Sequence, residues 1–221
     1  MNRQPSVIQS LHHIFDAERS LRDAHDALAG VANEQSDVRA ELLEVVTATI
    51  AESSELEEAE ASLRLVCVAR VLGELEGQDV ADRLIDVLAS GSTEARSEAG
   101  EQLQGLAFDR FKEVALAVEG ALARLPSGSL ALVELPYLLI DIPEPGVLKL
   151  LGMFLKHADP DAVGAAIEAL VELGDASATS ILHPLCEDTR PSSVGDDVPG
   201  APPQVTVGEL AVEALEILGE V

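Results

Sequence analysis

Apolar residues recur along most of the chain at the three- and four-residue spacing of an α-helix. Leu63, Val66, Cys67 and Val71 follow this spacing, and Arg70 lies at the flank of their stripe. The same spacing recurs within residues 84–88, 114–122 and 163–171. No segment alternates convincingly between apolar and polar positions as a half-buried β-strand does. The pattern therefore predicts an all-α protein without strands.

Local signals at the expected helix ends agree with this prediction. Two segments, Ser54–Glu57 and Thr206–Glu209, have the spacing of a capping box, in which a hydroxyl and a carboxylate each accept a backbone N–H bond. Asp159 is followed by a proline whose missing N–H costs nothing in the first helical turn. Glycines that suit the left-handed conformation lie near the expected helix ends, at Gly73, Gly91, Gly174 and Gly219.

An internal repeat predicts how these helices are arranged. Similar segments recur at intervals of about 30–45 residues, and their aliphatic anchors are Leu75, Leu106, Ile142, Leu173 and Leu218. After each of the first four anchors, a short turn leads into a second apolar helix, expected over residues 80–88, 111–122, 147–155 and 178–186. One helical hairpin cannot bury its own apolar face, whereas stacked hairpins form a continuous core. The repeat therefore predicts an α-solenoid of stacked helical hairpins over residues 54–221.

One repeat resembles a known family. Residues 168–175 read Glu-Ala-Leu-Val-Glu-Leu-Gly-Asp and follow Asp159-Pro160-Asp161, which resembles the short HEAT-like repeat of the phycobilin-lyase type. Residues 213–219 resemble the same core. The resemblance implies that the second helices line a concave binding face. Prolines depart from the pattern, so the second and third repeats are expected to be kinked or shifted, at Pro136, Pro143 and Pro145.

Residues 1–53 fit the repeat poorly and predict two amphipathic helices, over residues 8–28 and 38–50. We interpret them as an N-terminal helical cap or a divergent repeat. The seven-residue spacing of Ile14, Leu21 and Leu28 leaves a dimerisation or docking helix, and hence a homo-oligomer, as the alternative. Near the other end, the Pro-, Gly- and Ser-rich segment 188–205 is expected to form a flexible loop within the last repeat.

Charge and composition exclude several classes of function. The chain of 221 residues has 14 Lys+Arg against 40 Asp+Glu, a net charge of −26, and only 2% aromatic residues. The negative charge of such a chain repels the phosphates of nucleic acids, and the chain has few aromatic side chains on which bases could stack. These two properties exclude nucleic-acid binding. No signal peptide or membrane-spanning segment is evident, so no membrane insertion is expected. Cys67 and Cys186 are expected to be free thiols, and the protein to be cytoplasmic.

The sequence shows no clear motif for catalysis, phosphate binding or metal binding. The chain has neither a Gly-rich phosphate loop nor a G-x-S-x-G nucleophile segment. His12 with Asp16, and His183 with Cys186, supply two ligands each, which is too few for a metal site. We therefore predict a protein that is not an enzyme, with no catalytic residue, no cofactor and no metal.

The function that remains is the binding of a partner through a surface of complementary shape. We predict a scaffold or adaptor that binds a protein partner, one with a basic surface, through an acidic solenoid face. By analogy with HEAT-like repeats, the candidate partner-binding residues are Asp79, Asp82, Asp86, Glu113, Glu119 and Glu187. Two lysines, Lys149 and Lys156, interrupt the acidity of this face. The alternatives are a chromophore (bilin) lyase or pigment-protein chaperone, which the repeat family includes, and a regulatory subunit of a larger enzyme. The acidity alone fits a solubility surface equally well.

Overall fold

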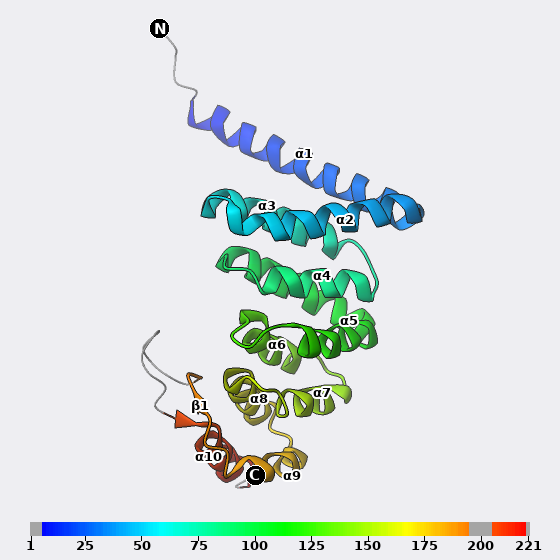
Figure 1. The fold of residues 1–221 in the computed structure, drawn as a ribbon. Coiled ribbons are helices and arrows are strands. Elements are labelled where there is room, and N and C mark those ends of the chain that lie inside the picture. Colours follow the sequence, from blue (N-terminus) through cyan, green and yellow to red (C-terminus); the bar gives the residue numbers. More distant parts are fainter. Residues whose placement is uncertain (1–5, 195–204, 220–221) are drawn as a thin grey trace.

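The helices lie one above another in successive layers from the N-terminus to the C-terminus (Figure 1). The computed structural model describes residues 6–194 and 205–219. Within them the α-helices are α1 (Val7–Glu34), α2 (Ser36–Glu52), α3 (Glu58–Gly73), α4 (Gln78–Leu88), α5 (Thr93–Arg124), α6 (Leu130–Ile140), α7 (Gly146–Phe154), α8 (Pro160–Leu173), α9 (Thr179–Leu182) and α10 (Val207–Gly219). The prediction of an all-α protein built by helix–helix packing is confirmed.

The helices pack in two rows that run along the molecule. In the first row α3 packs between α1 and α5, α6 between α5 and α8, and α8 also contacts α10. In the second row α4 packs between α2 and α5, and α7 also contacts α5. Helix α5 contributes to both rows because it kinks at Arg110, whose backbone is not helical (φ −139°, ψ 47°). This kink lies where the sequence predicts a turn between Leu106 and Phe111.

The core is aliphatic and continuous through the layers, as the low aromatic content requires. Four of the repeat anchors, Leu75, Leu106, Ile142 and Leu218, are buried. Leu173 is only half-buried. The single fully buried aromatic side chain among the described residues is Phe154, at the end of α7. The expected second helices over residues 80–88, 111–122 and 147–155 match α4, the second part of α5, and α7.

Two of the three predicted helix starts are confirmed. Thr206 and Glu209 form the capping box of α10: the Glu209 N–H donates to the Thr206 hydroxyl (3.2 Å), and the Thr206 N–H donates to the Glu209 carboxylate (2.7 Å). Asp159 caps α8 by accepting the Asp161 N–H. The predicted start after Ser54 is wrong. Helix α3 begins after Glu57, because the Ser54 hydroxyl donates back to the carbonyl of Ala51 in a 3₁₀ turn over Ser53–Glu55.

The prediction that no strand forms is also wrong. Strands β1 (Pro191–Ser192) and β2 (Val205–Thr206) pair antiparallel beside α8 and α10. These strands are too short to show an alternating pattern, and tertiary bonds hold them. The Ser192 hydroxyl, fully buried, donates to the Asp161 carboxylate (3.1 Å), which also accepts the Ser193 N–H (2.7 Å). Of the loop predicted over residues 188–205, the stretch 195–204 lies outside the described residues.

The N-terminal helices are confirmed as α1 and α2, but α1 is packed only at one end. Ala29 and Ala32 are its only buried residues. The Asn33 side chain donates to the Glu74 carbonyl (3.1 Å) and so ties this end of α1 to the end of α3. Figure 1 shows α1 diverging from α2 and α3 toward its N-terminus. No helix in the described part of the chain combines the length and apolar character needed to cross a membrane.

Candidate binding surface

The structure gathers five of the six predicted partner-binding acids on two adjacent helices. Asp79, Asp82 and Asp86 lie on α4, and Glu113 and Glu119 lie on the second part of α5, which packs against α4. The sixth acid, Glu187, lies apart from them near the C-terminal end of the stack. There it lines a hollow of ≈ 520 Å³ with acids of the neighbouring segment and α10, among them Asp188, Glu209, Glu213 and Glu216.

Arginines of the same chain neutralise much of the α4–α5 acid cluster. Arg39 of α2 binds Asp79 at 2.7 Å. Asp86 is bound by two arginines, Arg83 of its own helix at 2.5 Å and Arg124 of α5. The pairs of Asp79 with Arg39 and of Asp86 with Arg124 join neighbouring helices, so these acids stabilise the stack. Sequence reasoning missed both pairs because their partners lie about 40 positions away in the chain.

Asp82 and Glu113 are shielded as well. Asp82 is half-buried, and this burial raises its pKa, while the nearby charges of Arg124 and Arg83 oppose the effect. Glu113 binds Arg110 at 3.2 Å, and its second carboxylate oxygen is buried with no hydrogen-bond partner among the described residues. Neither carboxylate is therefore freely presented to a partner.

Glu119 and Glu187 are the two candidates that remain available to a partner. Neither forms an ion pair with another described residue. They lie on different parts of the molecule, since Glu119 belongs to α5 and Glu187 follows α9. The acidity available to a partner on the α4–α5 face is therefore much smaller than the sequence alone indicates.

A mostly apolar groove lies between α7 and the segment that contains α9. Its volume is ≈ 680 Å³, which is within the usual range of ligand-binding pockets, about 300–1,000 Å³. Its apolar lining consists of Pro145, Leu148, Gly152, Met153, Leu155, Ile181, Pro184 and Leu185. Its polar lining consists of Lys149, Lys156, Ser177 and Ser180.

The local sequence explains why a groove forms here. The segment expected to form a helix over residues 178–186 is helical only over Thr179–Leu182, and Pro184 lies in the 3₁₀ turn that follows. A helix this short covers only part of α7. Gly152 faces the tip of Ile181, where an added Cβ would lie 3.4 Å from the Ile181 Cδ1 atom, so α7 and α9 approach closely at one point. Leu148 and Met153 of α7 remain half-buried beside that point.

The groove carries most of the lysine charge of the chain. The only lysines are Lys112, Lys149 and Lys156, and the last two line the groove with exposed side chains. Every cation in the ion pairs found among the described residues is an arginine. The groove therefore combines an apolar floor with two positive charges that are not neutralised by those ion pairs. Sequence reasoning singled out both lysines, but only the packing of α7 against α9 places them around one groove.

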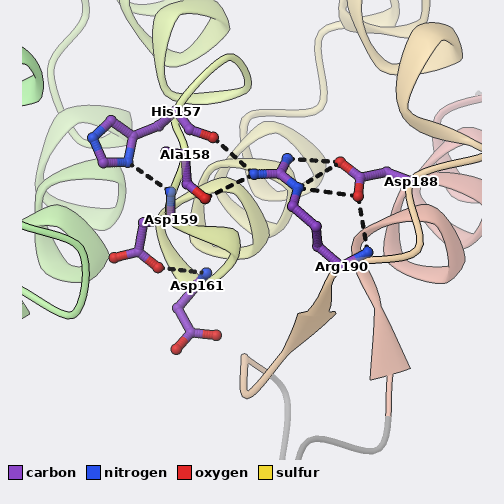
Figure 2. A network of polar contacts seen from close by, with 6 residues as sticks. All are labelled: His157, Ala158, Asp159, Asp161, Asp188 and Arg190. Atoms are coloured by element: carbon purple, nitrogen blue, oxygen red, sulfur yellow. Dashed lines mark hydrogen bonds and ion pairs between the residues drawn. The ribbon is translucent and has the colours of Figure 1, made fainter.

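A polar network holds the chain segment that directly follows the groove residue Lys156 (Figure 2). The Arg190 guanidinium donates to the carbonyls of His157 (3.0 Å) and Ala158 (2.9 Å), and it also binds the Asp188 carboxylate at 2.6 Å. His157 directly follows Lys156 in the chain. This arrangement, which we call the Arg190 clasp, ties the link between α7 and α8 to the segment after α9. It has the character of a structural contact, because each carbonyl and carboxylate in it is already hydrogen-bonded.

The Arg190 clasp makes part of the stability dependent on pH. Hydrogen bonds from Arg190 hold the pKa of Asp188 below its usual value, although burial opposes them. A carboxylate whose pKa is lowered by folding stabilises the protein above its unfolded pKa, about 4, and loses that contribution as the pH falls further. We expect the unfolding free energy of the native protein to fall more steeply below about pH 4 than that of Asp188→Asn. Urea unfolding across this pH range measures the difference, and identical pH profiles would contradict it.

Comparison with known proteins finds no matching family model, no matching curated protein and no matching solved structure.

Proposed function

We propose that this chain is an α-solenoid of the HEAT-like type that acts as a non-enzymatic scaffold or adaptor for a partner protein. The groove between α7 and α9 is its main docking point, and it is the observation that carries the proposal. Support comes from the two rows of helices, in which first and second helices alternate along the chain. Further support comes from the apolar lining of the groove and from Lys149 and Lys156 beside it.

The partner segment that suits this groove is an amphipathic helix with acidic residues beside its apolar face. Apolar side chains at helical spacing fill the groove, and burying them contributes about 25 cal/mol per Å² removed from water. Carboxylates next to them pair with Lys149 and Lys156. Each exposed pair contributes only about 0–1 kcal/mol, so the lysines select and orient the segment while the apolar contacts supply affinity. The distant acids of the chain interfere little, because physiological salt screens charges beyond about 8 Å.

Selection of binding peptides from a library tests the proposal without assuming the sequence of the partner segment. Helical peptides displayed on phage are selected on the full chain, and their affinities are measured by fluorescence anisotropy. We expect selected peptides to combine spaced apolar residues with Asp or Glu. We expect Lys149→Glu with Lys156→Glu to weaken their binding about tenfold or more, which corresponds to about 1.4 kcal/mol. The matched control is Lys112→Glu, which makes the same change at an exposed lysine of α5 and should leave affinity unchanged.

Two outcomes would overturn the groove as the docking point. The first is selected peptides that bind the double lysine variant as tightly as the native chain. The second is a set of basic peptides whose binding is lost with Glu119→Lys or Glu187→Lys and not with the lysine changes. That result would place the partner on the acidic surface instead. Because Glu119 and Glu187 lack intramolecular ion pairs among the described residues, changing them leaves the helix-joining pairs of Asp79 and Asp86 intact.

A further inference from the structure

The N-terminal half of α1 exposes a continuous set of large apolar side chains. Val7 is 77% exposed, Ile8 68%, Ile14 60%, Phe15 56% and Leu11 45%. An exposed apolar patch of this kind is unusual on a monomeric soluble protein and marks an interaction site. The apolar side chains of the interior helices, by contrast, form one continuous buried core.

The exposed residues continue the stripe by which α1 packs on the rest of the protein. Helical spacing places Val7, Leu11 and Ile14 on the same face as Ala29 and Ala32, which are buried. This face is covered at the C-terminal end of α1 and uncovered at the N-terminal end, where α1 diverges from α2 and α3 (Figure 1). The stripe is therefore built for burial along its whole length, and the chain itself covers only part of it.

We infer that a second copy of this chain covers the exposed half of α1, with the two α1 helices antiparallel across a two-fold axis near Ile14 and Phe15. A two-fold contact joins the same patch of each copy, so one apolar stripe supplies both sides of the interface. An antiparallel overlap centred between Ile14 and Phe15 pairs residues 7–22 of the two copies and spans about 24 Å of helix. This contact is independent of the partner proposed for the groove.

The charge distribution along α1 favours the antiparallel arrangement. The chain has no acid before Asp16, and this first stretch carries His12 and His13. The next stretch, residues 16–26, contains four acids and two arginines. Antiparallel pairing places the acid-free half of each copy against the acid-bearing half of the other, whereas parallel pairing would place acids beside acids.

Sedimentation velocity of the full chain, from sub-micromolar to hundred-micromolar concentration, tests the inference. We expect the native chain to reach twice its monomer mass, and Ile14→Asp to weaken dimerisation at least tenfold. Ser20→Asp is the matched control, because helical spacing places Ser20 on the opposite face of α1, and it should dimerise like the native chain. Circular dichroism of each variant verifies folding, which Ile14→Asp should preserve because Ile14 is exposed.

Crosslinking tests the orientation. In a background of Cys67→Ser and Cys186→Ser, we expect Ile14→Cys to form a disulfide between copies and Val7→Cys to form none, because antiparallel pairing about Ile14 and Phe15 places Val7 opposite residue 22 of the other copy, whereas parallel pairing would place it opposite Val7. A native chain that stays monomeric at every concentration overturns the inference. So does a dimer that Ile14→Asp leaves unchanged, or assembly beyond two copies, which a closed two-fold contact does not permit. Equal crosslinking at both positions overturns the antiparallel arrangement about Ile14.

Discussion

Replacing Phe154 by alanine is expected to destabilise the protein by about 3–5 kcal/mol, the usual cost of truncating a large core aromatic side chain. Phe154 is fully buried at the end of α7, within an otherwise aliphatic core. Truncation leaves a cavity that rigid neighbouring helices fill only in part. Equilibrium unfolding in urea measures the change as a lower transition midpoint at an unchanged slope.

The chain contains a matched control for this prediction. Phe108, on α5, is 57% exposed. Its truncation to alanine removes the same group from a site without core packing, so we expect a change within about 0.5 kcal/mol. A comparable loss of stability in both variants would mean that Phe154 is not a packed core residue.

Replacing Gly208 by alanine is expected to destabilise the protein by about 1–3 kcal/mol, because it overpacks a tight backbone contact. Gly208 lies in the first turn of α10, and its N–H donates to the Asp188 carbonyl (2.9 Å). An added Cβ would lie 2.8 Å from the carbonyl oxygens of both Cys186 and Asp188. These are backbone atoms that cannot rotate away, so α10 must move from the segment that also carries the Arg190 clasp.

Gly105 is the control for this second prediction. It lies inside α5, it is exposed, and no atom lies within 4 Å of an added Cβ. Gly105→Ala is therefore expected to stabilise the protein by about 0.5–1 kcal/mol, the helix-propensity difference between the two residues. Thermal unfolding of both variants should give shifts of opposite sign, and two shifts of the same sign would contradict the close approach at Gly208.

Helix positions and core residues were largely predictable from the sequence because they depend on local periodicity. The apolar spacing that predicted helices near residues 63–71 and 163–171 also identified residues that the structure buries, such as Val66, Ile167 and Leu170. The capping signals at Asp159 and Thr206 were correct because the atoms involved lie within three residues of each other. The kink at Arg110 likewise follows a turn signal in the repeat pattern.

The candidate site was predictable only in part. The sequence singled out six acids as candidate binding residues and two lysines that interrupt the acidity, but it did not show which of these charges would be neutralised. Arg124 reaches Asp86, and Arg39 reaches Asp79, only because layers about 40 residues apart in the chain are stacked. The groove depends in the same way on the short α9 beside α7, and a helical pattern over residues 178–186 did not reveal that only Thr179–Leu182 is α-helical.

The sequence by itself determined the all-α class, the helix ends with local caps and the aliphatic core, because periodicity and capping act over a few residues. The tertiary structure decided which charges are paired, where lysines meet an apolar groove, and that residues 191–192 pair with 205–206. It also decided that the apolar stripe of α1 is covered at Ala29 and exposed at Ile14. These features depend on the distances between helices remote in sequence, and no pattern within one helix encodes such distances.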